Sequence, residues 1–353
     1  MRDRMLLAVA GLGLVTLAIG SQVPSADAQA ASASARASGP APAGQAAPVT
    51  VDPGVLHVQV ILDKLGFGPG VLDGKGGQSL KAALKGFQES RGLTQTGQAD
   101  PATLRALYPY RAWRPVKAVV LTDAILAGPY IGRISKDYNA QSRLPALGYH
   151  SPLEKLAEMF HTTPQTLVAL NSAETMLRAG TRIVVPNALP TSRDYTIDDP
   201  AWRATVAMLN VDAKQPQADH IVVDKSDGVL RVMDKDDKLL AQFSATMGSA
   251  EFPLPIGTWT IKGTAYNPDW KYDPKLIAGS KPGAKEAVLQ PGPNNPVGVV
   301  WMDLSKPHYG IHGTPEPQNI GRTESNGCIR LTNWDAARVA LMVKPGTKAI
   351  FRA

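Results

Sequence analysis

The hydrophobic repeat of this 353-residue chain changes its period once, near residue 220, and this change restricts the fold most strongly. Before it, apolar residues recur every three or four positions, as in amphipathic helices. After it, short apolar runs such as 221–223 and 229–233 are separated by turn residues, as in hairpins. The length fits two or three domains at roughly 150 residues each. We therefore predict a multidomain protein with helical N-terminal parts and a mainly-β C-terminal domain.

Residues 1–28 have the composition of an export signal. Arg2 and Arg4 precede an apolar run over residues 5–20, and small residues with A-x-A spacing follow, up to Ala28. An uncleaved membrane anchor is the alternative. Residues 29–50, rich in Ala, Pro and Ser, predict a flexible linker. We expect an exported protein of the periplasm or cell wall, in contact with a membrane only if the signal stays uncleaved.

The charge and the single cysteine narrow the classes of partner and site. A lone cysteine excludes an intramolecular disulfide and a cysteine-rich zinc site. The six histidines are scattered, so we expect neither a metal site nor a cofactor. A net charge of +7 on an exported protein favours an acidic wall polymer over nucleic acid as partner. Nothing in the sequence predicts the oligomeric state.

Residues 51–108 predict a bundle of three short helices. Apolar stripes cover residues 55–65 and 80–87, with Ser79 as the candidate N-cap of the second helix, and Asp100-Pro101 begins the third. The turn and core residues, from Leu65-Gly66-Phe67 to Asp100-Pro101, resemble the three-helix peptidoglycan-binding domain of bacterial wall enzymes. The resemblance implies binding to peptidoglycan.

Residues 147–187 predict a second small module, with helices beginning at Ser151-Pro152 and Thr163-Pro164 and a strand at 182–186. The pattern resembles a LysM module, a βααβ fold that binds glycan, although His150-Ser151-Pro152 replaces its usual opening Gly-Asp-Thr. A LysM-like spacer without sugar binding is the alternative. Residues 109–146 form a connector without an assignment, and residues 188–218 read as a linker with a short helix from Trp202 to Leu209.

Cys328 and His312 are the candidate catalytic pair of residues 219–353. A cysteine nucleophile needs a base, which histidine supplies best near neutral pH. Gly327 permits close approach of the backbone to a substrate, and the Gly327 and Cys328 amides are candidates for an oxyanion hole. Arg330 lies on the same face as Cys328 if the segment is extended. An inert buried cysteine is the alternative.

The motifs His312-Gly313-Thr314 and Ser325-Asn326-Gly327-Cys328-Ile329-Arg330 resemble the signature of the L,D-transpeptidase catalytic domain, also called YkuD. Residues 255–261, 267–270 and 292–298 resemble further motifs of that domain. The resemblance implies a β-sandwich in which Cys328 is the nucleophile, His312 the base and the Gly313 carbonyl its orienting partner. It also implies a donor site lined by Tyr309, Ser325, Asn326 and Arg330, with Trp301 nearby. The position before Gly327 is often histidine in this family.

The resemblance implies a two-step acyl transfer. Cys328 attacks the L,D amide of a peptidoglycan stem tetrapeptide and releases D-alanine, and an amine acceptor then takes the acyl group to give a 3→3 cross-link. Two alternatives remain open: an L,D-carboxypeptidase or cross-link hydrolase on the same fold, and a wall-binding protein without catalysis. The sequence does not separate water from an amine as acceptor.

Overall fold

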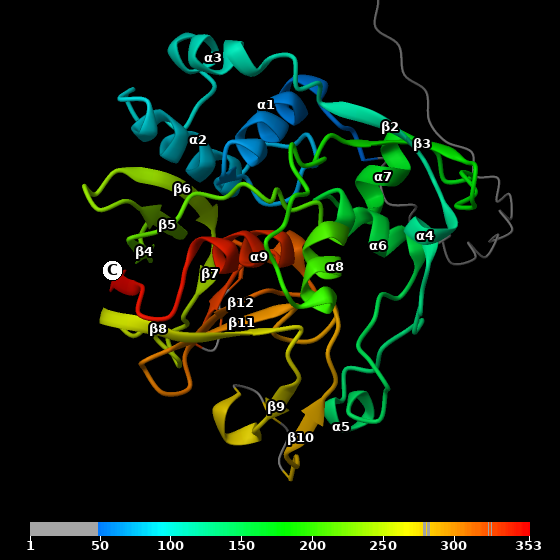
Figure 1. Cartoon of the computed structure of the whole chain (residues 1–353), viewed down its shortest axis with the longest axis vertical. Coiled ribbons are helices and arrows are strands. Elements are labelled where there is room, and N and C mark those ends of the chain that lie inside the picture. The colour runs from blue at the N-terminus through cyan, green and yellow to red at the C-terminus, as the bar shows by residue number, and fades with distance from the viewer. Residues whose placement is uncertain (1–48, 278–279, 281–282, 324, 326) are drawn as a thin grey trace, which may run out of the picture. The chain divides into compact units, whose positions relative to one another are not determined.

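The computed structural model describes residues 49–353, apart from residues 278–279, 281–282, 324 and 326 (Figure 1). The predicted signal at 1–28, most of the linker at 29–50 and the candidate site residue Asn326 therefore lie outside the described residues. No helix in the described ranges is long and apolar enough to cross a membrane.

The first part of the described chain contains the three predicted helices. They are α1 (Pro53–Lys64), α2 (Gln78–Ser90) and α3 (Pro101–Leu107), with a short strand β1 (Phe67–Gly68) after α1 and a 3-10 turn η1 (Tyr108–Tyr110) after α3. Asp100 caps α3 as predicted, because its side chain accepts a hydrogen bond from the Thr103 N–H. The predicted cap Ser79 is wrong. The Gly77 carbonyl already accepts from the Lys81 N–H at 3.0 Å, so α2 begins before Ser79.

These helices pack against the ten-stranded sheet, most of whose strands belong to the C-terminal part of the chain, instead of forming a free-standing bundle. β1 pairs in parallel with β6 (Leu239–Ser244), with Phe67 opposite Gln242. The stripes of α1 and α2 share a buried core with three sheet residues, Val222, Met233 and Leu239. Figure 1 shows α2 lying beside β6. The apolar area that three short helices cannot bury among themselves is thus covered by the sheet.

The middle part of the chain has a βααβ order. β2 (Val116–Val120) pairs antiparallel with β3 (Arg182–Pro186), and α6 (Pro152–Met159) and α7 (Pro164–Leu170) lie between them in the chain. Residues 121–151 are inserted after β2 and include α4 (Asp123–Leu126) and α5 (Tyr138–Gln141). This insertion explains why the first strand falls within the unassigned connector 109–146. The helix of the second linker is α8 (Pro200–Met208).

The C-terminal part is the predicted mainly-β domain. Its remaining elements are β4 (His220–Asp224), β5 (Val229–Met233), β7 (Thr246–Met247), β8 (Gly257–Tyr266), β9 (Trp270–Tyr272), η2 (Pro274–Leu276), β10 (Ala287–Leu289), β11 (Val300–Leu304), β12 (Gly310–His312), η3 (Pro317–Asn319), β13 (Ile329–Arg330), α9 (Asn333–Met342) and β14 (Lys348–Arg352). Among the described strands, β9 and β10 pair only with each other. The other strands of this part form one sheet together with β1 and β6, in the order β1-β6-β5-β4-β14-β8-β11-β12-β13-β7.

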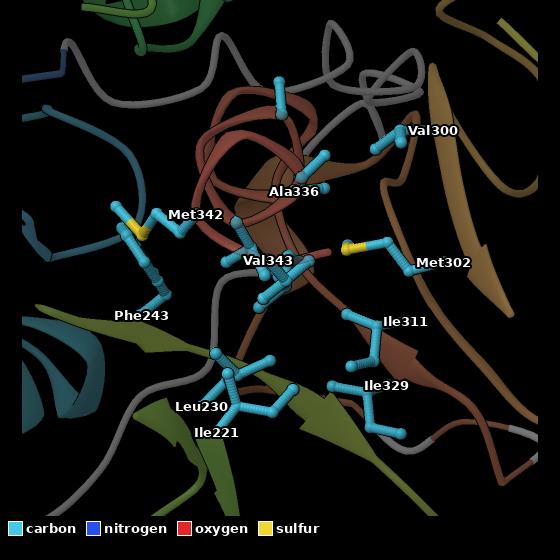
Figure 2. Packing of buried hydrophobic residues seen from close by; sticks show 14 of the residues in the cluster. Ile221, Leu230, Phe243, Val300, Met302, Ile311, Ile329, Ala336, Met342 and Val343 are labelled. Atoms are coloured by element: carbon cyan, nitrogen blue, oxygen red, sulfur yellow. The ribbon is translucent and has the colours of Figure 1, made fainter. Parts of the chain in front are cut away.

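The long strand β8 belongs to both halves of this sheet. Residues 257–260 pair with β14, and residues 261–266 pair with β11. Helix α9 is buried along nearly its whole length, and its apolar residues share one core with both halves. Figure 2 shows Ala336 and Met342 of α9, with Val343 just after it, among core residues that include Ile221 of β4, Met302 of β11 and Ile311 of β12. This core fixes β12, which carries His312, and β13, which Cys328 directly precedes.

Candidate active site

Strand pairing brings His312 and Cys328 together. β12 and β13 are parallel neighbours, with Ile311 opposite Ile329 and His312 opposite Arg330. Ile311 and Ile329 are fully buried in the core. Side chains alternate along a strand, so His312 and Arg330 face away from that core, and Cys328, directly before Ile329, faces the same side. The predicted shared face of Cys328 and Arg330 thus agrees with the register.

The ring of His312 is held by its own neighbour. Nδ1 of His312 lies 2.7 Å from the carbonyl oxygen of Gly313. A carbonyl only accepts hydrogen bonds, so Nδ1 carries the proton and Nε2 of a neutral ring keeps a free lone pair. This is the arrangement that a general base for the Cys328 thiol requires.

Burial holds the pair in its uncharged forms. Burial, assisted by the positive charge of Arg330, lowers the pKa of His312 to about 3, although the hydrogen bond to Gly313 opposes this shift. Burial raises the pKa of the Cys328 thiol, while the backbone N–H of Gly310 and the charge of Arg330 act in the opposite direction. In the resting site Cys328 is therefore a neutral thiol and His312 a neutral imidazole. The proton would pass from the thiol to the imidazole only during attack on a substrate.

The turn between β11 and β12 positions the thiol. The Sγ of Cys328 donates to the carbonyl oxygen of His308 at 3.7 Å. His308 has a φ of +67°, a left-handed conformation that is uncommon outside glycine. The turn conformation thus aims this carbonyl at the sulfur.

Two aromatic residues of the predicted site pack against His312 and Gly327, next to the candidate catalytic cysteine. Trp301 of β11 is half-buried and stacks on His312, with ring centroids 5.3 Å apart and planes at 21°. Tyr309 packs against Gly327, where a Cβ would lie 2.7 Å from its Cε1 atom. Gly327 also has a φ of +93°, which favours glycine. The sequence pattern Gly-Cys thus reflects both the backbone conformation and the space that Tyr309 occupies.

Ser325 and Arg330 have different positions in the site. Ser325 is buried, and its hydroxyl accepts from the Gly248 N–H at 2.7 Å and donates to the Cys328 carbonyl at 2.6 Å. These two hydrogen bonds therefore hold the loop before Cys328 in place on its buried side. Arg330 is half-buried, and its charge acts on both Cys328 and His312.

An aromatic cluster that the sequence did not predict joins the inserted segment 121–151 to strand β9. Tyr138 of α5 packs on Trp270 and Tyr272, with centroids 5.3 and 4.5 Å away. Burial raises the pKa of Tyr138, and the positive charge of Arg330 opposes that shift. The inserted segment 121–151 thus contacts strand β9, whose first residue, Trp270, belongs to one of the motifs that resemble the catalytic domain. No local signal marks Tyr138, because the contact joins residues far apart in the chain.

A second residue that sequence reasoning missed is Asn333, the first residue of α9. It is fully buried, and its Oδ1 accepts from the Val299 N–H at 3.2 Å. A Cβ on Gly313 would lie only 2.0 Å from this oxygen. Asn333 therefore packs directly against the residue whose carbonyl orients His312.

A cavity of about 550 Å³ has neither His312 nor Cys328 in its lining. Its lining combines residues from all three parts of the chain, among them Asp73, Tyr149, Glu158, Pro293 and Pro315. Within the described ranges, no group of three or more His, Cys, Asp or Glu side chains is placed to hold a metal ion.

Two protein-family models match parts of this chain. Residues 218–351 match the model of the L,D-transpeptidase catalytic domain, YkuD, and residues 51–107 match that of a putative peptidoglycan binding domain. The LysM-like reading of the middle module has no counterpart among these matches.

The curated relatives of this chain carry names of putative L,D-transpeptidases. A putative L,D-transpeptidase YkuD of Bacillus licheniformis is 51% identical over 59 residues, which are 17% of this chain and 36% of the relative. A putative L,D-transpeptidase YqjB of Bacillus subtilis is 28% identical over 140 residues, 38% of this chain and 72% of the relative. The chain thus spans about a third of the length of the first of these two relatives.

Among solved structures, an L,D-transpeptidase from Mycobacterium smegmatis aligns with a TM-score of 0.30 and 26% identity, over 38% of this chain and 58% of its own.

Proposed function

Because residues 218–351 form an L,D-transpeptidase catalytic domain and residues 51–107 a peptidoglycan-binding domain, we propose that this protein is an exported peptidoglycan L,D-transpeptidase. The observation that carries the proposal is the orientation of His312. Its Nδ1 is engaged by the Gly313 carbonyl at 2.7 Å, which leaves Nε2 free on the face that it shares with Cys328.

In the first step, the sulfur of Cys328 attacks the carbonyl carbon of the L,D amide between the third and fourth stem residues. Nε2 of His312 takes the thiol proton as the C–S bond forms, and the imidazolium then gives this proton to the leaving nitrogen of D-alanine. The amides of Gly327 and Cys328 would stabilise the negative oxygen of the tetrahedral intermediate. The product is a thioester on Cys328 and free D-alanine.

In the second step, the amine of an acceptor stem attacks the thioester and restores the thiol, which leaves a 3→3 cross-link. Water competes with the amine, so the half-buried position of Cys328 supports transfer over hydrolysis.

Arg330 would couple donor binding to the base. Its positive charge is one cause of the low pKa of His312. A carboxylate of the donor stem that pairs with Arg330 would cancel much of this field. The pKa of His312 would then rise when substrate binds, which makes the ring a better base at the moment of attack.

The accessory parts would bring the enzyme to its substrate. The peptidoglycan-binding domain and the net charge of +7 support association with the wall. The βααβ module would be a LysM-like glycan-binding or spacer unit, because its strand and helix order is that of the predicted fold.

The test is incubation of the purified protein with disaccharide-tetrapeptide, followed by mass analysis of the products. A dimer that has lost one D-alanine, absent with Cys328→Ala, is the expected result. A tripeptide monomer as the single product would indicate an L,D-carboxypeptidase instead. Binding to isolated walls without any acyl-enzyme on the wild-type protein would indicate a binding protein.

A further inference from the structure

Helix α6 lies outside the catalytic domain, yet one of its carboxyl groups is connected to the catalytic histidine. We propose that Glu158 is a positioning residue for His312 and acts through Asn333 and the Gly313 carbonyl. The proposal rests on the proposed function in one respect, that His312 is the base for Cys328. It assigns a part in the reaction to a module that the catalytic-domain match at 218–351 does not include.

The first link joins Glu158 to Asn333. Asn333 is fully buried and Glu158 is 6% exposed. The Nδ2 of Asn333 donates to Oε1 of Glu158 at 2.7 Å and to the Pro293 carbonyl at 3.2 Å, while its Oδ1 accepts from the Val299 N–H. Both amide hydrogens thus face acceptors and the amide oxygen faces a donor. The Asn333 side chain is therefore locked in one orientation, because a flip would lose all three bonds.

The second link joins Asn333 to Gly313 by contact. A Cβ added at Gly313 or at Gly298 would lie 2.0 Å from Oδ1 of Asn333, so the amide fills the space between these two glycines. The Gly313 carbonyl accepts from Nδ1 of His312 at 2.7 Å. A displaced Asn333 amide therefore moves the peptide group that sets the orientation of the imidazole.

Tyr149 binds the carboxyl oxygen of Glu158 that does not contact Asn333. The hydroxyl of Tyr149 donates to Oε2 of Glu158, so both carboxyl oxygens are engaged. Burial raises the pKa of Glu158 to about 7, although its bonds to Tyr149 and Asn333 oppose the shift. A glutamine can reproduce both contacts, since its oxygen can accept from Asn333 and its NH₂ can donate to the tyrosine oxygen. A methionine of similar volume can make neither.

The test measures acylation of Cys328 by p-nitrophenyl acetate, which needs no peptidoglycan and releases one nitrophenolate per reactive thiol. We expect Glu158→Met to slow acylation about tenfold or more, because a base turned away from its productive geometry loses much of its effect. Glu158→Gln should stay within about twofold of the wild type. The control is Glu154→Met on the same helix, which removes the 3.0 Å contact with Nδ2 of Asn294 but no link to Gly313.

A double-mutant cycle separates positioning from general damage. In a His312→Ala background, Glu158→Met should have no further effect on the acylation rate, because the base that it positions is gone. In addition, the NMR signal of the His312 Nδ1 proton should shift or broaden in Glu158→Met and stay in place in Glu158→Gln.

Three results would overturn the proposal: an unchanged rate in Glu158→Met, an equal loss in the His312→Ala background, or an equal loss in Glu154→Met. If circular dichroism shows that Glu158→Met does not fold, Glu158→Asp replaces it. That variant withdraws the acceptor from Asn333 and keeps the charge, and the same slowing is expected. If the ester assay gives the expected rates but no cross-linked dimer forms from the tetrapeptide, the positioning role of Glu158 holds and the proposed transpeptidase function fails.

Discussion

Replacement of Arg338 by methionine tests how the three parts of the chain are held together. The Arg338 guanidinium on α9 donates to both oxygens of Asp63 on α1, at 2.8 and 3.0 Å, and to Asp335 at 3.1 Å. Nδ1 of His161, just after α6, lies 3.1 Å from Asp63, and its Nε2 lies 2.7 Å from the Leu209 carbonyl. All four side chains are buried. One buried charge cluster therefore joins the helical unit, the middle module and the catalytic domain.

The magnitude follows from the charges that the substitution leaves behind. Methionine fills most of the volume of the arginine stem, so packing losses are small. The two buried carboxylates of Asp63 and Asp335 then lack the guanidinium from which both accept, and such a broken buried pair costs about 3–5 kcal/mol. Burial already raises the pKa of Asp335 to about 6 against the opposing charge of Arg338, and loss of that charge raises the pKa further.

The pH dependence has a definite sign. A carboxyl whose pKa is higher in the folded protein than in the unfolded chain favours folding when it is protonated, and this contribution disappears as the pH rises through the folded value. In Arg338→Met, Asp335 is protonated and uncharged at pH 5. At pH 8 the same carboxyl either carries an unpaired buried charge or stays protonated, and both states cost free energy relative to the unfolded chain. The loss of stability should therefore be larger at pH 8 than at pH 5.

The assay is urea unfolding of the whole protein at both pH values, with the first transition used if there are several. The control is Arg352→Met, which breaks the 2.7 Å pair with Asp224. Arg352 is half-exposed, and the buried Asp224 keeps its hydrogen bonds from Ser226 and Asp227, so the loss should be about 1 kcal/mol or less. A loss below about 1 kcal/mol in Arg338→Met, or an equal loss at both pH values, would refute the reasoning.

Three further predictions concern the catalytic pair. His312→Ala should slow acylation of Cys328 by about 10²- to 10⁴-fold, as seen by intact mass over time, and an unchanged rate would remove His312 from the mechanism. The acylation rate should change little between about pH 5 and 8, because burial lowers the pKa of His312 to about 3 and raises that of Cys328, so both groups stay uncharged over this range; an inflection near 6.5 would contradict this. Gly327→Ala should reduce acylation about tenfold or more, since its Cβ would lie 2.7 Å from Tyr309. The control is Gly346→Ala, at a residue with a φ of +91° and, among the described residues beyond its chain neighbours, no atom within 4 Å of the added Cβ; it should cost only about 1–2 kcal/mol of stability and leave the acylation rate unchanged.

Local sequence signals predicted much of the helical and hairpin structure. Asp100, Ser151 and Thr163 cap the helices that they were expected to cap, because a cap depends on a few neighbouring residues. Ser79 did not, since the extended Gly77 before it already begins α2. The strand at 116–120 escaped prediction because its partner β3 lies more than 60 residues later, and an exposed strand of a small module has little period of its own.

The sequence by itself determined which residues are chemically able to react. A lone cysteine after glycine, a histidine before it and the change of period near residue 220 are local facts, and they made Cys328 and His312 the candidate pair, while the resemblance to the L,D-transpeptidase signature implied the role of Gly313. Only the tertiary structure decided what surrounds them. The stacking of Trp301, the charge cluster around Arg338 and the contacts of Asn333 with Glu158 and Gly313 each join residues from separate elements. Such contacts leave no periodic trace in a sequence, because they arise from packing in three dimensions and not from neighbouring residues along the chain.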